Sequence, residues 1–170
     1  NPIDTTVALA EGARLAGVRI IERVSVTGFQ IANGVVTGVE TDHGPIACEI
    51  AVNCAGIWAR DIGAMAGVNV PLYAAEHMYV MTEADPLIPP DLPVLRDTDG
   101  YVYVKEDAGK LLIGAFEPNA KPLPLSALPE KFEFGELQED WNQFELPMTR
   151  AIEMIPMLEK AGIRRFMNGP

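Results

Sequence analysis

The sequence predicts an α+β fold in two parts. The first part combines a helix, a β-meander and a buried strand, and the second is an antiparallel sheet with flanking helices. Short apolar runs separated by turn dipeptides such as Asn33-Gly34, Asp99-Gly100 and Ala108-Gly109 are typical of antiparallel strands. One nearly all-apolar run, residues 50–56, suits a buried strand of a parallel sheet. Near Pro71 the chain changes character, because proline-rich loops separate the later strand-like runs.

Composition limits the size and the partners of the protein. The chain has 170 residues, 48% of them hydrophobic, which is enough for one globular domain or for two linked half-domains. The formal net charge of −11 repels nucleic acid phosphates and anionic membrane surfaces. We therefore expect no nucleic acid partner and no membrane partner.

The cysteines and the chain ends add three expectations. Cys48 and Cys54 match no zinc-binding pattern, even with the two histidines, so no metal site is expected. Both lie in strand-like sequence, which predicts buried thiols in a reducing, cytoplasmic compartment. Residues 1–4 lack the features of a signal peptide, and no run is long enough to span a membrane. The absence of an initiator methionine indicates an internal piece of a longer protein.

The first part opens with a helix from Asp4 or Thr5, either of which can cap it, to Ala16, before Gly17. Its small residues on one face are suited to close packing on a sheet. A meander of short strands follows, with Asn33-Gly34 as a hairpin turn, and then the buried strand 50–56 and a helix ended by Gly67. The predicted meander strands and helix span residues 18–21, 24–27, 35–41, 46–50 and 58–66.

The second part alternates strands with loops. Two proline-rich loops, residues 85–91 and 117–129, interrupt the strands. A helix over about 140–155 has an apolar stripe, and Pro147 is expected near its first turns, where proline costs least. The predicted strands span residues 73–82, 94–96, 101–104, 111–116 and 163–167.

Residues 51–59 carry the first recognisable motif. Val52-Asn53-Cys54-Ala55-Gly56-Ile57-Trp58 resembles the V-x-x-A-G-x-W strand and turn of the D-amino-acid-oxidase-like flavoprotein superfamily, in which this turn lies beside FAD. Small residues let a ligand approach the backbone, and a helix N-terminus favours phosphate. The resemblance implies that Ala55, Gly56 and Trp58 contact FAD.

Further motifs extend the resemblance over essentially the whole chain. In their order they are similar to dimethylglycine and sarcosine dehydrogenases of this superfamily. The resemblance implies a partial FAD-binding domain in residues 1–72, a substrate-binding domain in 73–160, and a strand returning to the FAD-binding domain in 161–170. The motifs are residues 69–72, 75–79, 92–97, 100–104, 111–120 and 168–170.

Several expected features of that family do not occur in the sequence. The G-x-G-x-x-G dinucleotide fingerprint is absent, as are the histidine region that carries covalent flavin in some relatives and the folate-binding module. The cofactor of the intact protein is expected to be FAD. Without the glycine-rich turn that holds the pyrophosphate, this chain alone is expected to bind FAD poorly and to be inactive.

The implied reaction is oxidation of an N-methylated amine, for which His77 and Tyr79 are the first candidate catalytic residues. They alternate along one strand and therefore point to one face. His77 is suited to deprotonate the substrate ammonium, and Tyr79 to hydrogen-bond its carboxylate. The alternative is that both side chains are satisfied within the sheet.

Four further residues are candidates for substrate binding. Tyr101 and Tyr103 share a face, and aromatic rings attract a methylated ammonium; the alternative is ordinary cross-strand packing. Arg96 is suited to bind a carboxylate, or alternatively to pair with a nearby acid on the surface. Phe116 is suited to wall the site, or belongs to the core.

The function predicted for the intact protein is a flavin-dependent amine dehydrogenase or oxidase of the dimethylglycine and sarcosine type. Its partners are a small N-methylated amine and, if dioxygen is not the oxidant, an electron acceptor protein. Two alternatives stay open: an amino-acid oxidase of the same superfamily, and a non-catalytic ligand- or partner-binding module with the same fold.

Overall fold

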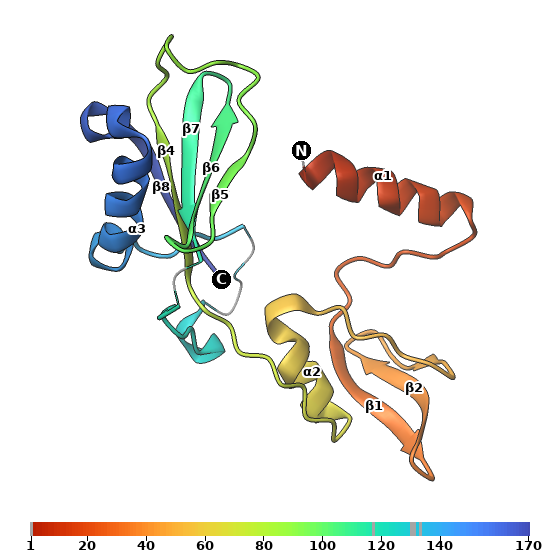
Figure 1. The fold of residues 1–170 in the computed structure, drawn as a ribbon. Coiled ribbons are helices and arrows are strands. Elements are labelled where there is room, and N and C mark those ends of the chain that lie inside the picture. Colours follow the sequence, from red (N-terminus) through yellow and green to blue (C-terminus); the bar gives the residue numbers. More distant parts are fainter. Residues whose placement is uncertain (1, 117, 130–131, 133) are drawn as a thin grey trace. The chain divides into compact units, whose positions relative to one another are not determined.

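The computed structural model describes residues 2–116, 118–129, 132 and 134–170. The chain divides into two compact units, Asn1–Pro71 and Leu72–Pro170, which we call unit 1 and unit 2. Unit 1 holds a three-stranded sheet and unit 2 a five-stranded sheet, each with helices (Figure 1). The predicted α+β class is therefore confirmed.

Unit 1 consists of a long helix, a small meander and a short helix. The turn between β1 and β2 has Asn33 at φ 51° and Gly34 at φ 78°, as a type I′ hairpin requires, so this predicted turn is confirmed. Antiparallel pairing gives the sheet order β1-β2-β3. The elements are α1 (Pro2–Leu15), β1 (Val26–Ala32), β2 (Val35–Thr41), β3 (Ile46–Ala47), the 3-10 helix η1 (Gly56–Trp58) and α2 (Ala59–Met65).

Three predictions about unit 1 are wrong. Residues 18–21 and 50–56 form no strand, because a strand needs a neighbour to accept its backbone hydrogen bonds and none pairs with either segment within the described residues. Ile50 and Val52 are each 81% exposed instead of buried. Cys54 is exposed and Cys48 only half-buried, since neither residue lies in a strand of the sheet.

Unit 2 is built on an antiparallel sheet in the order β5-β6-β7-β4-β8. Its last strand, β8, pairs with β4, so it lies within the sheet of unit 2; its assignment to the FAD-binding domain stays a prediction. The hairpin between β6 and β7 turns at Ala108 and Gly109, both with positive φ, as predicted. The strands are β4 (His77–Thr82), β5 (Leu95–Asp97), β6 (Val102–Asp107), β7 (Lys110–Ala115) and β8 (Ile163–Gly169).

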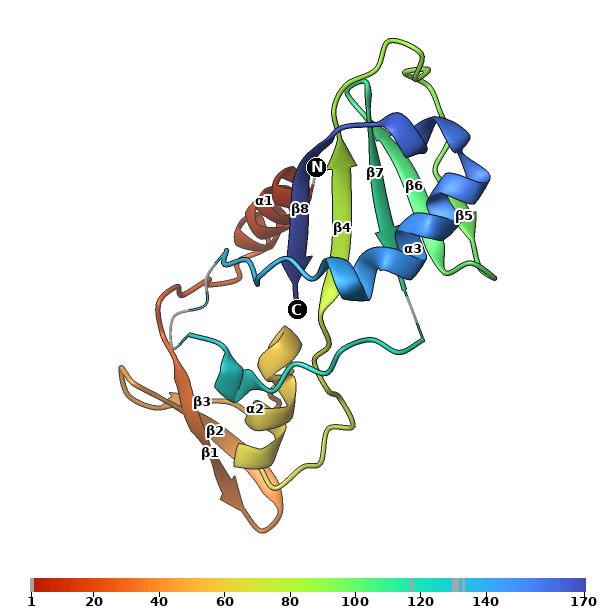
Figure 2. The same cartoon turned by 90° about the vertical axis from the view of Figure 1, so that its left-hand side faces the viewer.

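The core of unit 2 lies between this sheet and α3 (Trp141–Met154), which crosses one face of the sheet (Figure 2). Phe144 is 1% exposed and packs edge-on against Phe166 of β8. Asp140 caps the helix by accepting a hydrogen bond from the Gln143 backbone N–H. Two short 3-10 helices, η2 (Leu125–Ala127) and η3 (Pro156–Lys160), complete the unit.

Pro147 differs from its expected position. It lies inside α3, beyond the first turn, and is buried. Proline has no N–H to donate to the intrahelical hydrogen bonds, so the contribution of Pro147 to α3 is the packing of its buried ring. In the described part of the chain, no helix combines the length and the apolar character that crossing a bilayer would need.

Candidate functional site

The face of the unit 2 sheet opposite α3 brings together most of the residues predicted to act on substrate. Along β4 the core side is occupied by Met78, Val80 and Thr82, so His77 and Tyr79 point to the other side. The strand register then aligns a row across the sheet. Its members, in order, are Met167, Tyr79, Gly114, Tyr103 and Arg96.

His77, Tyr103 and Phe116 form a cluster of rings on this face. The imidazole Nε2 and the Tyr103 hydroxyl lie 3.2 Å apart and share a hydrogen bond whose direction depends on the tautomer of His77. The imidazole stacks on Phe116 with ring centroids 4.7 Å apart, and the Tyr103 and Phe116 centroids are 5.5 Å apart. Three segments far apart in the sequence thus meet at one point.

Arg96 completes the cluster from the edge strand β5. Its guanidinium carbon lies 5.0 Å from the centre of the Phe116 ring, within the range of a cation–π contact. The ion pairs between described residues do not include Arg96, so the predicted alternative of a pair with Asp97, Asp99 or Glu106 is not realised there. We call His77, Arg96, Tyr103 and Phe116 the ring cluster.

Burial shapes the chemistry of the cluster. Removal from water, and to a smaller extent the nearby Tyr79, raises the pKa of Tyr103 above its ordinary value of 10.0. The Tyr103 hydroxyl therefore keeps its proton at neutral pH and is available as a donor. Tyr79 lies in the same row of side chains but belongs to none of the ring contacts described above. Phe116 is 54% exposed, so it is a wall of this face rather than the core residue of the alternative interpretation.

Tyr101 takes part in none of the ring contacts described above. It precedes β6 in the turn, with φ 60°, so the alternation that would place it beside Tyr103 does not extend to it. Its backbone oxygen accepts a hydrogen bond of 2.8 Å from the Phe116 N–H, and its side chain is 44% exposed. Binding of substrate by Tyr101 stays a prediction.

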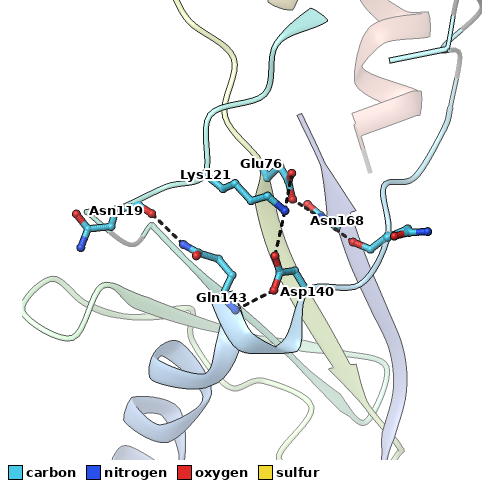
Figure 3. A network of polar contacts seen from close by, with 7 residues as sticks. Glu76, Asn119, Lys121, Asp140, Gln143 and Asn168 are labelled. Carbon is cyan, nitrogen blue, oxygen red and sulfur yellow. Dashed lines mark hydrogen bonds and ion pairs between the residues drawn. The ribbon is translucent and has the colours of Figure 1, made fainter. Parts of the chain in front are cut away.

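A polar network supports the strand that carries His77 (Figure 3). Glu76 immediately precedes His77, and its carboxylate accepts a hydrogen bond from Asn168 Nδ2 at 2.7 Å and pairs with Lys121 Nζ at 3.2 Å. Lys121 also bonds Asp140, the cap of α3, at 3.1 Å. Asn168 Nδ2 donates to the Gln138 oxygen as well, while its buried Oδ1 has no partner among the described residues.

This network joins the start of β4, the loop after β7, the cap of α3 and the end of β8. The Glu76 and Leu123 backbone N–H groups donate to the oxygens of Lys121 and Ala74, so backbone and side-chain bonds fix the same place. The Asp140 hydrogen bond, followed by those with Glu76, raises the pKa of Lys121. Lys121 therefore stays charged while it joins the two carboxylates.

The residues predicted to contact FAD lie in unit 1. The turn at Ala55 is closed by Asn53, whose Oδ1 accepts from the Ala55 N–H at 3.2 Å and whose Nδ2 donates to the Ala59 oxygen at 2.8 Å. Gly56 has φ 56°, and no atom lies within 4 Å of the position that a Cβ would take there. Trp58 is 46% exposed at the end of η1.

This turn fits FAD in part. The open space at Gly56 leaves room for a flat ligand near the backbone. The adjoining cavity of about 470 Å³ is lined almost wholly by apolar side chains of the hairpin, residues 51–55 and α2, so it suits apolar groups rather than a diphosphate. Contact of Ala55, Gly56 and Trp58 with FAD stays a prediction, and we call these three residues the cofactor edge.

Three features of these sites were not predicted. Gly114, Asn53 and the Glu76–Lys121 network received no role from the sequence. A glycine within the apolar run 111–116 was a readable signal for close approach of another group. The pairing of Lys121 with Glu76 gave no local signal, because the two residues are far apart in the chain. The described residues hold no group of three or more side chains placed to bind a metal ion.

Comparison with known proteins gives matches over the full chain. A family model described as "FAD dependent oxidoreductase" matches residues 1–170. The chain is 42% identical over 171 residues to 4-methylaminobutanoate oxidase (formaldehyde-forming) of Paenarthrobacter nicotinovorans, covering all of the chain and 20% of that enzyme. It is 41% identical over 175 residues to mitochondrial sarcosine dehydrogenase of Homo sapiens, covering all of the chain and 19% of that enzyme.

A third relative carries a different kind of name. The chain is 38% identical over 170 residues to the mitochondrial pyruvate dehydrogenase phosphatase regulatory subunit of Mus musculus, covering 98% of the chain and 19% of that protein. Among solved structures, L-proline dehydrogenase from P. horikoshii superposes with a TM-score of 0.77 at 25% identity, covering 99% of the chain and 42% of that structure. The chain therefore spans about a fifth of the length of these sequence relatives.

Proposed function

The chain belongs to the family of FAD-dependent oxidoreductases, and from this premise we propose that the intact protein oxidises the C–N bond of a small N-methylated amino acid. The ring cluster is the observation that carries the proposal. It joins an imidazole, a protonated phenol, a guanidinium and an aromatic wall on one sheet face. The names of two relatives support the substrate class, since sarcosine and 4-methylaminobutanoate are both N-methylated amino acids.

The cluster meets three needs of amine oxidation. The reacting nitrogen must lose its ammonium proton, and the imidazole of His77 is a group that can accept it. The substrate carboxylate needs a cation, which Arg96 supplies in the fork geometry that carboxylates match. The methyl groups need an apolar wall, which Phe116 supplies.

Tyr103 orients the base in this proposal. Its hydrogen bond to Nε2 fixes the rotation of the His77 ring, which also stacks on Phe116. His77 acts as the base in the tautomer whose Nε2–H donates to the Tyr103 oxygen, because Nδ1 is then the ring nitrogen that lacks a hydrogen and accepts the ammonium proton. Because the pKa of Tyr103 is raised, its hydroxyl stays neutral and adds no negative charge beside the substrate carboxylate. Tyr79, on the other side of Gly114 in the same row, extends the polar surface for that carboxylate.

The cofactor edge at Ala55, Gly56 and Trp58 has a different role, which is to contact FAD. When bound, FAD supplies the two-electron acceptor for the hydride that leaves an N-methyl carbon, and the amine becomes an iminium. The open backbone at Gly56 allows the close approach that such a cofactor needs. Reoxidation then requires dioxygen or an electron acceptor protein.

One observation favours a second candidate, a non-catalytic module of the same fold. It is the 38% identity to a phosphatase regulatory subunit, whose name states regulation rather than oxidation. Such a module would keep the α+β architecture without turning over an amine.

Anaerobic visible spectroscopy of the intact protein separates the two candidates. Sarcosine, dimethylglycine and 4-methylaminobutanoate are added in turn, with glycine as the matched compound that lacks an N-methyl group. The proposal predicts a flavin spectrum that bleaches with at least one N-methylated amino acid and not with glycine. A flavin spectrum unchanged by all of them contradicts the proposed reaction, and a folded intact protein that stays colourless with added FAD supports the non-catalytic module.

A further inference from the structure

A glycine lies at the centre of the sheet face that carries the ring cluster. Gly114, in β7, stands opposite Tyr79 of β4 on one side and opposite Tyr103 of β6 on the other. The φ angle of Gly114 is not positive, so the backbone conformation does not require glycine at this position. A glycine inside a strand weakens it, because it costs chain entropy and has no side chain to pack. The reason for this glycine lies in its surroundings.

The ring of Tyr103 occupies the space that a side chain at position 114 would take. A Cβ built on Gly114 would lie 2.6 Å from Cε1 of Tyr103, and still closer to its Cζ and Oη. Real Cβ atoms do not approach other heavy atoms so closely. The colliding atoms are at the far end of a side chain that can rotate, so an added methyl group displaces the Tyr103 ring rather than the strand.

The position of this ring decides which contacts Tyr103 makes. Lying over Gly114, it places its hydroxyl 3.2 Å from His77 Nε2 and its ring 5.5 Å from Phe116 between centroids. A ring lifted from the sheet by a methyl group loses the hydrogen-bond distance first, because a bond already at 3.2 Å has little tolerance.

We propose that Gly114 is a positioning residue for amine oxidation, whose missing side chain lets Tyr103 lie on the sheet with its hydroxyl against His77. This inference rests on the proposed function and adds a residue that acts on the reaction only through Tyr103. This positioning role differs from a purely stabilising one, in which the aromatic ring covers the strand glycine and only stabilises the sheet. The two roles predict different effects of Gly114→Ala.

The test measures Gly114→Ala in the intact protein by two methods. The first is NMR of ¹³C-labelled tyrosine, with the Tyr103 signal assigned by Tyr103→Phe. Burial raises the pKa of Tyr103, so lifting the ring into solvent is expected to move its titration towards the ordinary value. The second is the rate of flavin reduction by the best substrate, expected to fall about 100-fold, as misplacement by about 1 Å can cost.

Gly28→Ala is the matched control. Gly28 also lies in a strand, but its added Cβ would meet only Glu40 side-chain atoms at 3.8 and 3.9 Å, which is ordinary contact. We expect Gly28→Ala to leave the Tyr103 titration and the reduction rate unchanged. A double variant, Gly114→Ala with Tyr103→Phe, completes a cycle; once the hydroxyl is gone, Gly114→Ala should slow reduction no more than about threefold further.

The outcomes are distinct. A Tyr103 titration and a reduction rate both unchanged in Gly114→Ala overturn the inference. So does a slow Gly114→Ala variant whose loss is equally large in the Tyr103→Phe background, because the residue then acts through the sheet. If no amine reduces the wild-type flavin, the proposed function fails, while a shifted Tyr103 titration still supports the positioning of the ring by Gly114.

Discussion

Unit 1 and unit 2 differ most in how much of their apolar surface is buried. Within residues 2–71, the buried positions are Gly38, Ala59 and Gly63, none with a large side chain. Unit 2 buries a continuous cluster between its sheet and α3, including Phe144, Met78 and Ile113 at 1% exposure or less. Helix α1 has no buried residue, and its apolar residues Ile3, Val7 and Leu15 are each more than 60% exposed.

The contrast shows what holds the residues of each candidate site in position. The ring cluster stands on a sheet that is backed by a closed core, so its side chains are held by packing as well as by hydrogen bonds. The cofactor edge stands on a turn held mainly by Asn53, with uncovered apolar strands around it. Since the chain spans about a fifth of its relatives, we infer that other segments of the intact protein complete unit 1.

The largest predicted effect is loss of the core of unit 2. Phe144→Ala removes a 1% exposed ring that contacts Trp141 and Phe166, which should lower the free energy of unfolding by about 3–5 kcal/mol. Urea unfolding followed by Trp141 fluorescence, in a Trp58→Phe background, reports on unit 2 alone. A change below about 1 kcal/mol would mean that unit 2 is not a closed core.

A smaller loss is expected from a buried hydroxyl. Thr82 is 1% exposed, and its Oγ1 accepts from the Leu111 N–H at 3.0 Å while donating to the Glu83 oxygen at 2.8 Å. Thr82→Val keeps the shape but leaves that N–H without a partner, at a cost of about 1–3 kcal/mol. The same fluorescence assay measures it, with Thr37→Val of unit 1 as the exposed control, expected within about 0.5 kcal/mol of wild type.

Val52 tests whether unit 1 is completed in the intact protein. In this chain Val52 is 81% exposed, so Val52→Ala should change stability by less than about 0.5 kcal/mol. In the intact protein the same change should cost about 1.5 kcal/mol, because two methyl groups leave a covered surface. Equal small effects in both proteins would show that Val52 stays exposed, contrary to this account.

The smallest effect concerns acid stability. The Gln143 backbone N–H, and then Lys121, hold the pKa of Asp140 below its ordinary value of 3.8. A carboxyl with a lowered folded pKa stabilises the fold above the unfolded pKa, and this contribution disappears as the pH falls through the folded pKa. Asp140→Asn keeps a side chain that can cap the helix but removes the carboxyl that titrates. Unit 2 of this variant should therefore lose less stability than the wild type when the pH falls from about 5 to about 2. Asp42→Asn in unit 1 should leave the Trp141 transition unaffected.

Local chemistry was enough to predict much of the fold. The dipeptides Asn33-Gly34 and Ala108-Gly109 form the hairpin turns that their backbone freedom indicates. The helix over about 140–155 followed from its apolar stripe. Residues 50–56 were predicted as a buried strand and are exposed, because a strand and its burial depend on neighbours that local sequence does not contain.

The candidate site was predictable only strand by strand. Alternation along β4 placed His77 and Tyr79 on one face without knowledge of the fold. The meeting of His77 with Tyr103, and of Arg96 with Phe116, depends on the register between strands, which is non-local. For Tyr101, alternation gave a wrong grouping with Tyr103, since the positive φ of Tyr101 interrupts the strand pattern before β6 begins.

The most direct test of the central claim is the rate of flavin reduction in the intact His77→Asn protein with saturating sarcosine, or whichever N-methylated amino acid bleaches the wild type. If the ring cluster removes the ammonium proton, this rate should fall by a factor of about 10² to 10⁴ while the flavin stays bound. A rate within about threefold of wild type, with the same pH dependence, would contradict a role for this face of unit 2 in the reaction.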